Sequence, residues 1–176
     1  TLTVVSRIAT FALEPSHGSI AGGTEISIYS YGVPFSGTAY CRFDRKIQVS
    51  ATFDALNGIV QCITPAHAAG NSTVEISHDG VHFVMINDMF TYAAIPTISK
   101  MFPMIGSISG KTAVTMVGTG FASSGTLCEF DSVAAEVTFV SSKEIICISP
   151  SILGPADVRV QVSTNGADYS LSALPF

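Results

Sequence analysis

The ten residues Pro15–Thr24 read PSHGSIAGGT, and the ten residues Pro103–Thr112, which begin 88 positions later, read PMIGSISGKT. Proline, glycine, serine, isoleucine and threonine recur at matching places in the two stretches. An internal repeat of this kind decides the architecture before any single element is assigned. Two further pairs of stretches extend the match at nearly the same spacing: Cys41–Asp44 with Cys128–Asp131, and Cys62–Pro65 with Cys147–Pro150.

Each copy of the repeat is predicted to hold about seven short β-strands. Runs of Val, Ile, Thr, Phe and Tyr are separated by 15 Gly and 8 Pro, and no long stretch has a helical apolar period. Asp79-Gly80 and Asn165-Gly166 predict tight hairpins, because these residue types tolerate the positive φ of a type I′ turn. In the first copy, the predicted strands are Thr24–Ser30, Thr38–Asp44, Gln48–Phe53, Gly58–Thr64, Ser72–His78, His82–Met85 and Met89–Ala93.

The predicted fold class is therefore all-β, with two tandem immunoglobulin-like β-sandwiches. The first domain is expected at residues 9–94 and the second at residues 95–176, after an N-terminal strand or linker at residues 1–8. The second domain is predicted to lack its final strand. Phe176 aligns with Phe90, and in the first copy the closing strand continues from Phe90 through Ala93.

Composition narrows the function classes. Hydrophobic residues make up 47% of the chain and charged residues 12%, which predicts packed cores and excludes disorder. A net charge of −5 argues against a nucleic-acid-binding surface, and Arg42, Arg45 and Lys46 form the only basic cluster. No apolar run reaches the length of a membrane span. Because so few residues are charged, part of the surface is expected to be covered by glycans or by neighbouring subunits.

The four cysteines occupy equivalent places in the two copies. Four cysteines allow three pairings, and the repeat favours Cys41–Cys62 and Cys128–Cys147, one bridge in each domain. The alternative is that these are free thiols packed as small hydrophobic side chains. Paired cysteines would indicate an oxidising, extracellular compartment. The sequon Asn71-Ser72-Thr73 agrees with that compartment and makes Asn71 a candidate glycosylation site.

The repeated pattern resembles the IPT/TIG domain family. The pattern is Pro-x-x-Gly-x-x-x-Gly-x-Thr, Cys-x-Phe, Cys-x-Thr/Ser-Pro, Asn/Asp-Gly and a closing Phe, which covers nearly the whole chain twice. The resemblance implies an immunoglobulin-like fold and a place in plexins, growth-factor-receptor-type ectodomains and other surface proteins, or in some transcription factors. The second copy departs from the pattern at Lys111, which replaces the second Gly of the Gly-Gly-Thr turn.

Catalytic, cofactor and metal sites are not predicted. His78 and His82 flank a hairpin turn, a position more typical of solvated residues than of metal ligands. Glu129 and Asp131 share one strand face, but Arg42 stands where the first copy would need the matching acid. No nucleophile, base and orienting group come together in a recognisable order. The chain is therefore expected not to be an enzyme and to use no cofactor.

Residues 1–8 are the most informative segment for assembly. When aligned with the closing strand of the first domain, they supply Leu2, Val4, Val5 and Ile8 as the apolar side chains of a strand. One hypothesis is that this strand completes the second domain of another copy, which would build a head-to-tail filament. The alternative is a plain linker between domains.

The predicted function is thus a non-enzymatic extracellular structural or adhesion module that associates with itself or with neighbouring domains of its own kind. A stalk segment of a ligand-binding cell-surface receptor is the first alternative. A DNA-binding immunoglobulin-like domain is a weaker one, since it would call for more positive charge.

Overall fold

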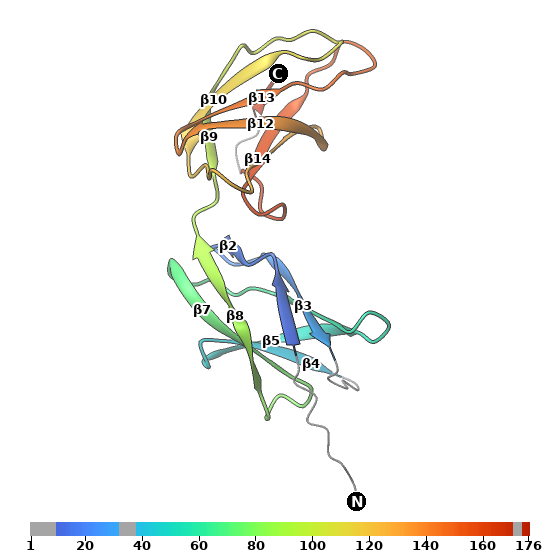
Figure 1. Ribbon diagram of the computed structural model, residues 1–176, viewed down its shortest axis with the longest axis vertical. Coiled ribbons are helices and arrows are strands. Elements are labelled where there is room, and N and C mark those ends of the chain that lie inside the picture. The colour runs from blue at the N-terminus through green and yellow to red at the C-terminus, as the bar shows by residue number, and fades with distance from the viewer. Residues whose placement is uncertain (1–9, 32–37, 171–173) are drawn as a thin grey trace, which may run out of the picture. The chain divides into compact units, whose positions relative to one another are not determined.

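The computed structural model describes residues 10–31, 38–170 and 174–176, and it divides the chain into two compact units, Thr1–Ala93 and Ala94–Phe176. The boundary lies one residue before the predicted one. All the elements in the described part of the chain are β-strands (Figure 1). No helix there is long and apolar enough to cross a membrane.

Domain 1 consists of eight strands in the order β1-β3-β6-β5-β4-β7-β8-β2. Strand β5 pairs with β4 through its first half and with β6 through its second half, so it passes from one layer of the sandwich to the other. Neighbouring strands in this order are antiparallel, except that β2 runs parallel to the end of β8. The strands are β1 Thr10–Glu14, β2 His17–Ser19, β3 Glu25–Tyr31, β4 Ala39–Phe43, β5 Ile47–Asp54, β6 Ile59–Ile63, β7 Gly70–Ser77 and β8 Val84–Ala93.

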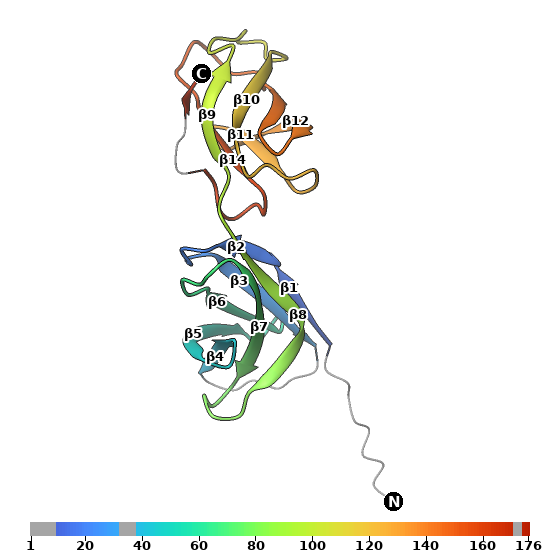
Figure 2. The same cartoon turned by 90° about the vertical axis from the view of Figure 1, so that its left-hand side faces the viewer.

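Domain 2 repeats this plan with seven strands in the order β15-β14-β11-β12-β13-β10-β9, and Figure 2 shows β9 beside β10. Strand β12 joins the two layers as β5 does, because it pairs first with β11 and then with β13. The strands are β9 Thr97–Phe102, β10 Ala113–Thr119, β11 Leu127–Phe130, β12 Val133–Ser141, β13 Glu144–Ile148, β14 Arg159–Ser163 and β15 Leu174–Pro175.

Each domain has its own core, and a disulfide crosses it. Alternation along β4 buries Cys41 and Phe43, and alternation along β11 buries Cys128 and Phe130. The structure joins Cys41 to Cys62 and Cys128 to Cys147, which is the pairing that the repeat favours. Each bridge ties two strands that are not neighbours in the sheet order, with Cα atoms 6.4 Å apart.

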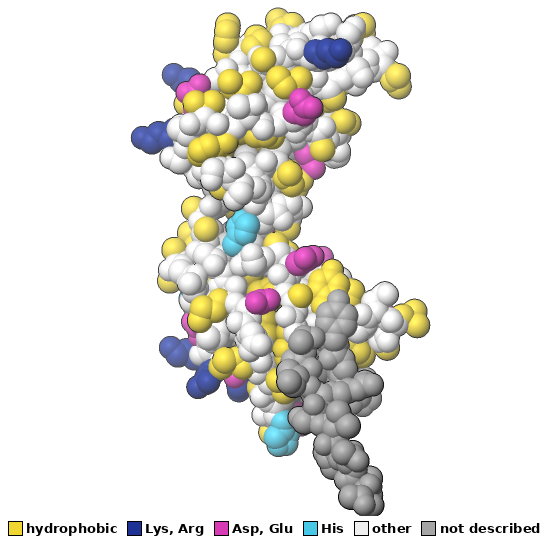
Figure 3. Space-filling view, viewed as in Figure 1, with side chains coloured by type: hydrophobic (Ala, Val, Ile, Leu, Met, Phe, Trp, Pro, Cys, Tyr) yellow, Lys and Arg dark blue, Asp and Glu magenta, His cyan; other side chains and the backbone are white. Residues whose placement is uncertain are grey.

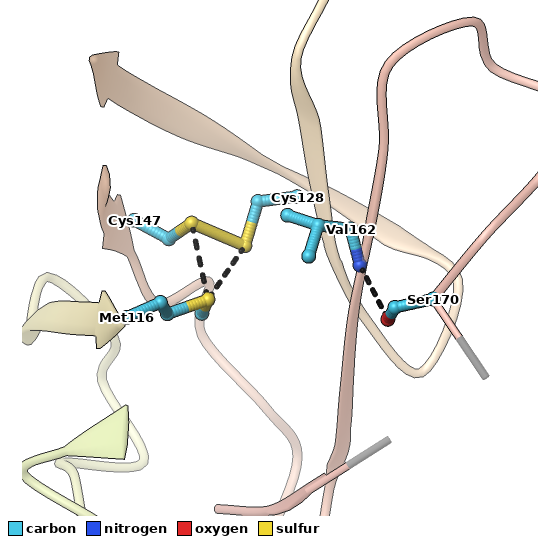
Figure 4. The surroundings of a disulfide bond; sticks show 5 residues. All are labelled: Met116, Cys128, Cys147, Val162 and Ser170. Atoms are coloured by element: carbon cyan, nitrogen blue, oxygen red, sulfur yellow. Dashed lines mark hydrogen bonds between the residues drawn. A yellow bond between two sulfur atoms is a disulfide. The ribbon is translucent and has the colours of Figure 1, made fainter. Parts of the chain in front are cut away.

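Met116 packs directly on the second disulfide. Its Sδ lies 4.0 Å from Cys128 Sγ and 3.7 Å from Cys147 Sγ (Figure 4). The sulfur atoms of a disulfide carry no proton and cannot donate a hydrogen bond. The two sulfur contacts of Met116 are therefore packing contacts between polarisable atoms. Met116, Cys128 and Cys147 are all buried, so this three-sulfur cluster is part of the domain 2 core.

The structure differs from the sequence prediction in several elements. The turns at Asp79-Gly80 and Asn165-Gly166 are not the predicted type I′ hairpins, because Gly80 and Gly166 have a positive φ but Asp79 and Asn165 do not. His82–Met85 and Met89–Ala93 were predicted as two strands but form one long strand, β8, which absorbs an irregularity in its register with β7. Strands β1, β2 and β9 were not predicted. The final strand of domain 2 was predicted to be missing, but the structure contains β15, which pairs with β14.

Candidate functional site

The parallel pairing of β2 with β8 closes one seam of domain 1. His17, Gly18 and Ser19 lie beside Thr91, Tyr92 and Ala93. Two backbone bonds fix the ends of this pairing: the Thr91 amide donates to Ser16 O (2.9 Å) and the Ile20 amide donates to Ala93 O (3.0 Å). The last three residues of β8 therefore act as a strand that covers this edge of the core.

Tyr92 is the side chain that plugs this seam. It is 1% exposed, and its ring lies 4.8 Å from that of Phe90, 6.4 Å from that of Phe43 and 4.6 Å from the stacked imidazole of His67. Burial, with a contribution from the Asp44 carboxylate, raises the pKa of the Tyr92 hydroxyl well above its usual range. The hydroxyl is buried without a hydrogen-bond partner. Tyr92 thus stabilises the core of domain 1 through the packing of its aromatic ring, and its hydroxyl makes no hydrogen bond.

In domain 2 the corresponding place is a groove of about 220 Å³. The segment 104–107, counterpart of the segment that contains β2, forms no strand, and Ile105 is 83% exposed. Figure 3 shows hydrophobic side chains at many points of the visible surface. The groove is lined mainly by apolar residues: Met104, Ile105, Gly106, Ser107, Ile108, Phe130, Ser149, Pro150, Ile152, Pro155, Ala156, Asp157, Val158 and Phe176.

The register of β15 identifies this groove as the counterpart of the seam. Phe176 and Val158 exchange backbone hydrogen bonds at 2.8 and 3.0 Å, as Phe90 stands opposite Ser72 in domain 1. The rings of Phe130 and Phe176 meet edge to face at 5.3 Å. A Cβ atom at Gly106 would overlap the Phe176 ring, and one at Gly18 would crowd the Phe90 ring. Phe176 therefore occupies the place of Phe90.

The glycosylation candidate Asn71 directly precedes the predicted strand Ser72–His78, and in the structure it is exposed near the start of β7. Its Oδ1 accepts a hydrogen bond from the Thr91 hydroxyl (2.9 Å). Glycosylation itself stays a prediction. The predicted assembly residues Leu2, Val4, Val5 and Ile8 lie outside the described residues.

The polar residues that the sequence singled out hold turns and strand ends. Asp79 accepts hydrogen bonds from the His82 ring and from the His82 and Val81 amides, and these bonds lower the pKa of its carboxyl group. Asp131 accepts a bond from the Arg159 amide, as Asp44 does from the Thr73 amide. The described part of the chain contains no group of three or more His, Cys, Asp or Glu side chains placed to hold a metal ion.

One polar cluster was missed by sequence reasoning because its members are far apart in the chain. Arg42 Nε donates to the buried Glu75 at 2.7 Å, and its guanidinium lies 3.8 Å above the Phe83 ring. The counterpart in domain 2 has Glu129, which accepts bonds from the Tyr169 hydroxyl and from Gln161. Strand register places both clusters on equivalent faces of the two domains. The pair Arg42 and Glu75 of domain 1 corresponds to Glu129 and Gln161 in domain 2, so the positions are the same and the charges differ.

Comparison with known proteins agrees with this architecture. The family model of the IPT/TIG domain matches residues 11–92 and again residues 96–176. Human Fibrocystin-L is 30% identical over 194 residues, which covers 100% of the chain and 4% of that protein. Plexin-2 of Caenorhabditis briggsae is 23% identical over 176 residues, covering 88% of the chain and 9% of that protein. The chain thus spans a small fraction of the curated relatives it matches.

A solved structure of the plexin A4 extracellular region shares the fold. It covers 100% of the chain and 20% of its own length, with a TM-score of 0.55 and 18% sequence identity.

Proposed function

The chain belongs to the IPT/TIG domain family, and we propose that it works as a structural segment of a larger extracellular protein. In this role, two immunoglobulin-like domains form part of a line of similar domains, and they contribute shape and spacing. The relatives support the proposal, since one is the extracellular region of a plexin and the match to Fibrocystin-L covers only a small part of that protein.

The observation that carries the proposal is the pair of equivalent disulfides. All four cysteines are at most 3% exposed, and each bridge spans the core of its own domain. Disulfides persist in oxidising compartments and are rare where glutathione keeps thiols reduced. A domain of about 85 residues has a small core, so a buried bridge is a large part of its stability. These properties favour a secreted or cell-surface protein over the DNA-binding alternative.

The role that we propose requires no catalysis. The acidic and histidine side chains that could do chemistry hold turns and strand ends, as Asp79 and Asp131 do. The basic cluster is partly neutralised, since Arg42 and Arg45 both pair with Glu75. A segment within a receptor stalk is compatible with this role, because a stalk also uses its domains as spacers.

A finer proposal concerns the groove of domain 2. We propose that residues 1–8 of another copy bind in this groove as an added strand, because the groove is lined mainly by apolar residues. The contact would be head-to-tail and would repeat along a filament.

Two experiments test these proposals separately. The chain is secreted from cultured animal cells, and mass spectrometry determines its disulfides and whether Asn71 carries a glycan. The extracellular role predicts two intradomain disulfides in the secreted protein, and secreted material with free thiols would contradict it. Electron microscopy of the chain, beside a variant that lacks residues 1–8, tests the filament. Filaments that disappear on deletion support strand donation, and monomers in both samples refute it.

A further inference from the structure

We propose that the outer face of domain 2 is an interface that binds a second copy of this chain. The outer face is the side of strands β9, β10, β13 and the second half of β12 that is turned away from the core. Its apolar side chains are Phe102, Val117, Ile146 and Ile148. They point outward because side chains alternate along a strand, and their neighbours in the strands are buried, as Met101 and Cys147 are. None of these four apolar residues lines the groove, so this surface is distinct from the one proposed to bind residues 1–8.

The register of the strands brings these apolar side chains together. Phe102 lies opposite Thr115, and Thr115 lies opposite Ile146, so one row crosses three strands. Val117 occupies the next outward position of β10, and adjacent strands lie about 4.8 Å apart. Phe102 is 77% exposed and Val117 is 40% exposed. A contiguous apolar surface of this kind marks an interaction site, whereas single exposed apolar residues are ordinary.

Domain 1 shows that the fold does not need this apolar row. Glu14, Ser27 and Gln61 form the equivalent row of domain 1, across β1, β3 and β6. Phe102 thus stands in the place of Glu14, and Ile146 stands in the place of Gln61. Because the two domains share this part of the strand order, the fold does not explain the apolar side chains of domain 2, and contact with a partner does.

The charges at the rim of the outer face select a second copy as the partner. Lys100 lies on the edge strand β9, level with Val117. Glu136 lies on β12, level with Ala113, and is therefore at the diagonally opposite corner of the face. Both residues are exposed, and neither takes part in an ion pair within the described part of the chain. A surface that carries a cation at one corner and an acid at the opposite corner is complementary to itself.

A two-fold axis through the centre of the outer face satisfies this complementarity. Four strands about 4.8 Å apart, with a rise of about 3.4 Å per residue, make the face nearly as wide as it is long. The axis can therefore place Lys100 of each copy against Glu136 of the other, with the two sheets crossing near a right angle, as in orthogonal sheet packing. The same axis places Phe102 over Ala113 and Ile148 of the second copy. The contact would bury the apolar row between two ion pairs, and it closes as a dimer.

Sedimentation velocity over a concentration series tests the interface on the whole chain. The wild-type chain should form dimers. Phe102→Glu, which introduces the residue that domain 1 has at this position, should raise the dissociation constant of the dimer roughly 30-fold or more, because it removes the aromatic anchor. The matched control is Ile63→Glu, since Ile63 is 51% exposed and is the counterpart of Ile148 on the equivalent face of domain 1. The control should leave the dimer unchanged, and thermal melts check that both variants are folded.

An exchange of charges tests the pairing of Lys100 with Glu136. Lys100→Glu or Glu136→Lys alone should raise the dissociation constant roughly 10-fold, because each places like charges together at both corners of the contact. An equimolar mixture of the two variants should restore the wild-type affinity, since the heterodimer regains both pairs of opposite charge.

Three results would overturn this interface. One is a wild-type chain that stays monomeric at millimolar concentration. Another is a dimer that Ile63→Glu weakens as much as Phe102→Glu does, or that the mixture of charge variants fails to restore, because the copies would then meet in another arrangement. The third is a dimer that dissociates when residues 1–8 are deleted, since the proposed filament depends on that segment and this contact does not.

Discussion

Removal of one disulfide should destabilise only the domain that contains it. We consider the double substitution Cys41→Ala and Cys62→Ala, which leaves no orphan thiol. The bridge links residues 21 positions apart, and loop-closure entropy for a loop of this length gives about 3 kcal/mol. Both sulfur atoms lie in side chains at most 3% exposed, so their loss also removes packing in the core. The expected decrease in the free energy of unfolding of domain 1 is therefore about 3 kcal/mol or more.

Urea unfolding followed by NMR measures this loss for each domain separately. The methyl signals of the buried Val60 report on domain 1 and those of the buried Val160 on domain 2. With an m-value of about 1 kcal/mol/M, the midpoint of domain 1 should fall by roughly 3 M, and that of domain 2 should stay within error. The reciprocal variant, Cys128→Ala with Cys147→Ala, should reverse the pattern. An unchanged Val60 midpoint, or an equal fall at both probes, would refute the reasoning.

Three further predictions concern the cores and the titrating groups. Met116→Ala should cost domain 2 about 2–5 kcal/mol in urea unfolding, whereas Met116→Leu should cost less than about 1.5 kcal/mol. Burial acts to raise the pKa of Asp44, but bonds from the Thr73 amide, Ser72 and His67 hold it below 3.8. Asp44 therefore stabilises domain 1 fully above its unfolded pKa, and stability should fall as pH drops through its folded pKa, an effect that Asp44→Asn removes in acid titrations. Burial and the bond to Glu129 raise the pKa of Tyr169 to about 12, so domain 2 should lose stability above pH 10, and Tyr169→Phe should flatten that loss in alkaline melts.

The sequence was sufficient for the fold class because its repeated punctuation is local. Cys-x-Phe places two buried side chains on one strand face. Asp79-Gly80 and Asn165-Gly166 mark equivalent turns, in which the Gly80 and Gly166 amides donate hydrogen bonds to the Ser77 and Ser163 hydroxyls. Strands β1, β2 and β9 escaped prediction for a physical reason. They are edge strands, stabilised by a neighbouring strand on one side, and His17–Ser19 has the end of β8 as its strand neighbour.

The groove could be predicted only in outline. The alignment of Phe176 with Phe90 predicted that domain 2 lacks its final strand, whereas the structure contains β15 paired with β14. The lining of the groove could not be predicted from the sequence. Phe130, Ile152 and Gly106 come from separate parts of the chain, and the fold alone brings them to one place. The Arg42 and Glu129 clusters escaped prediction for the same reason.

Disulfide mapping of the native protein tests the central claim, an extracellular structural role, most directly. Each domain is closed by its own bridge, Cys41–Cys62 in domain 1 and Cys128–Cys147 in domain 2, and such bridges persist in oxidising compartments. We predict that mass spectrometry of the unreduced protein, secreted from animal cells, finds these two bridges. Free thiols at the four cysteines, or a bridge between the domains, would contradict the account.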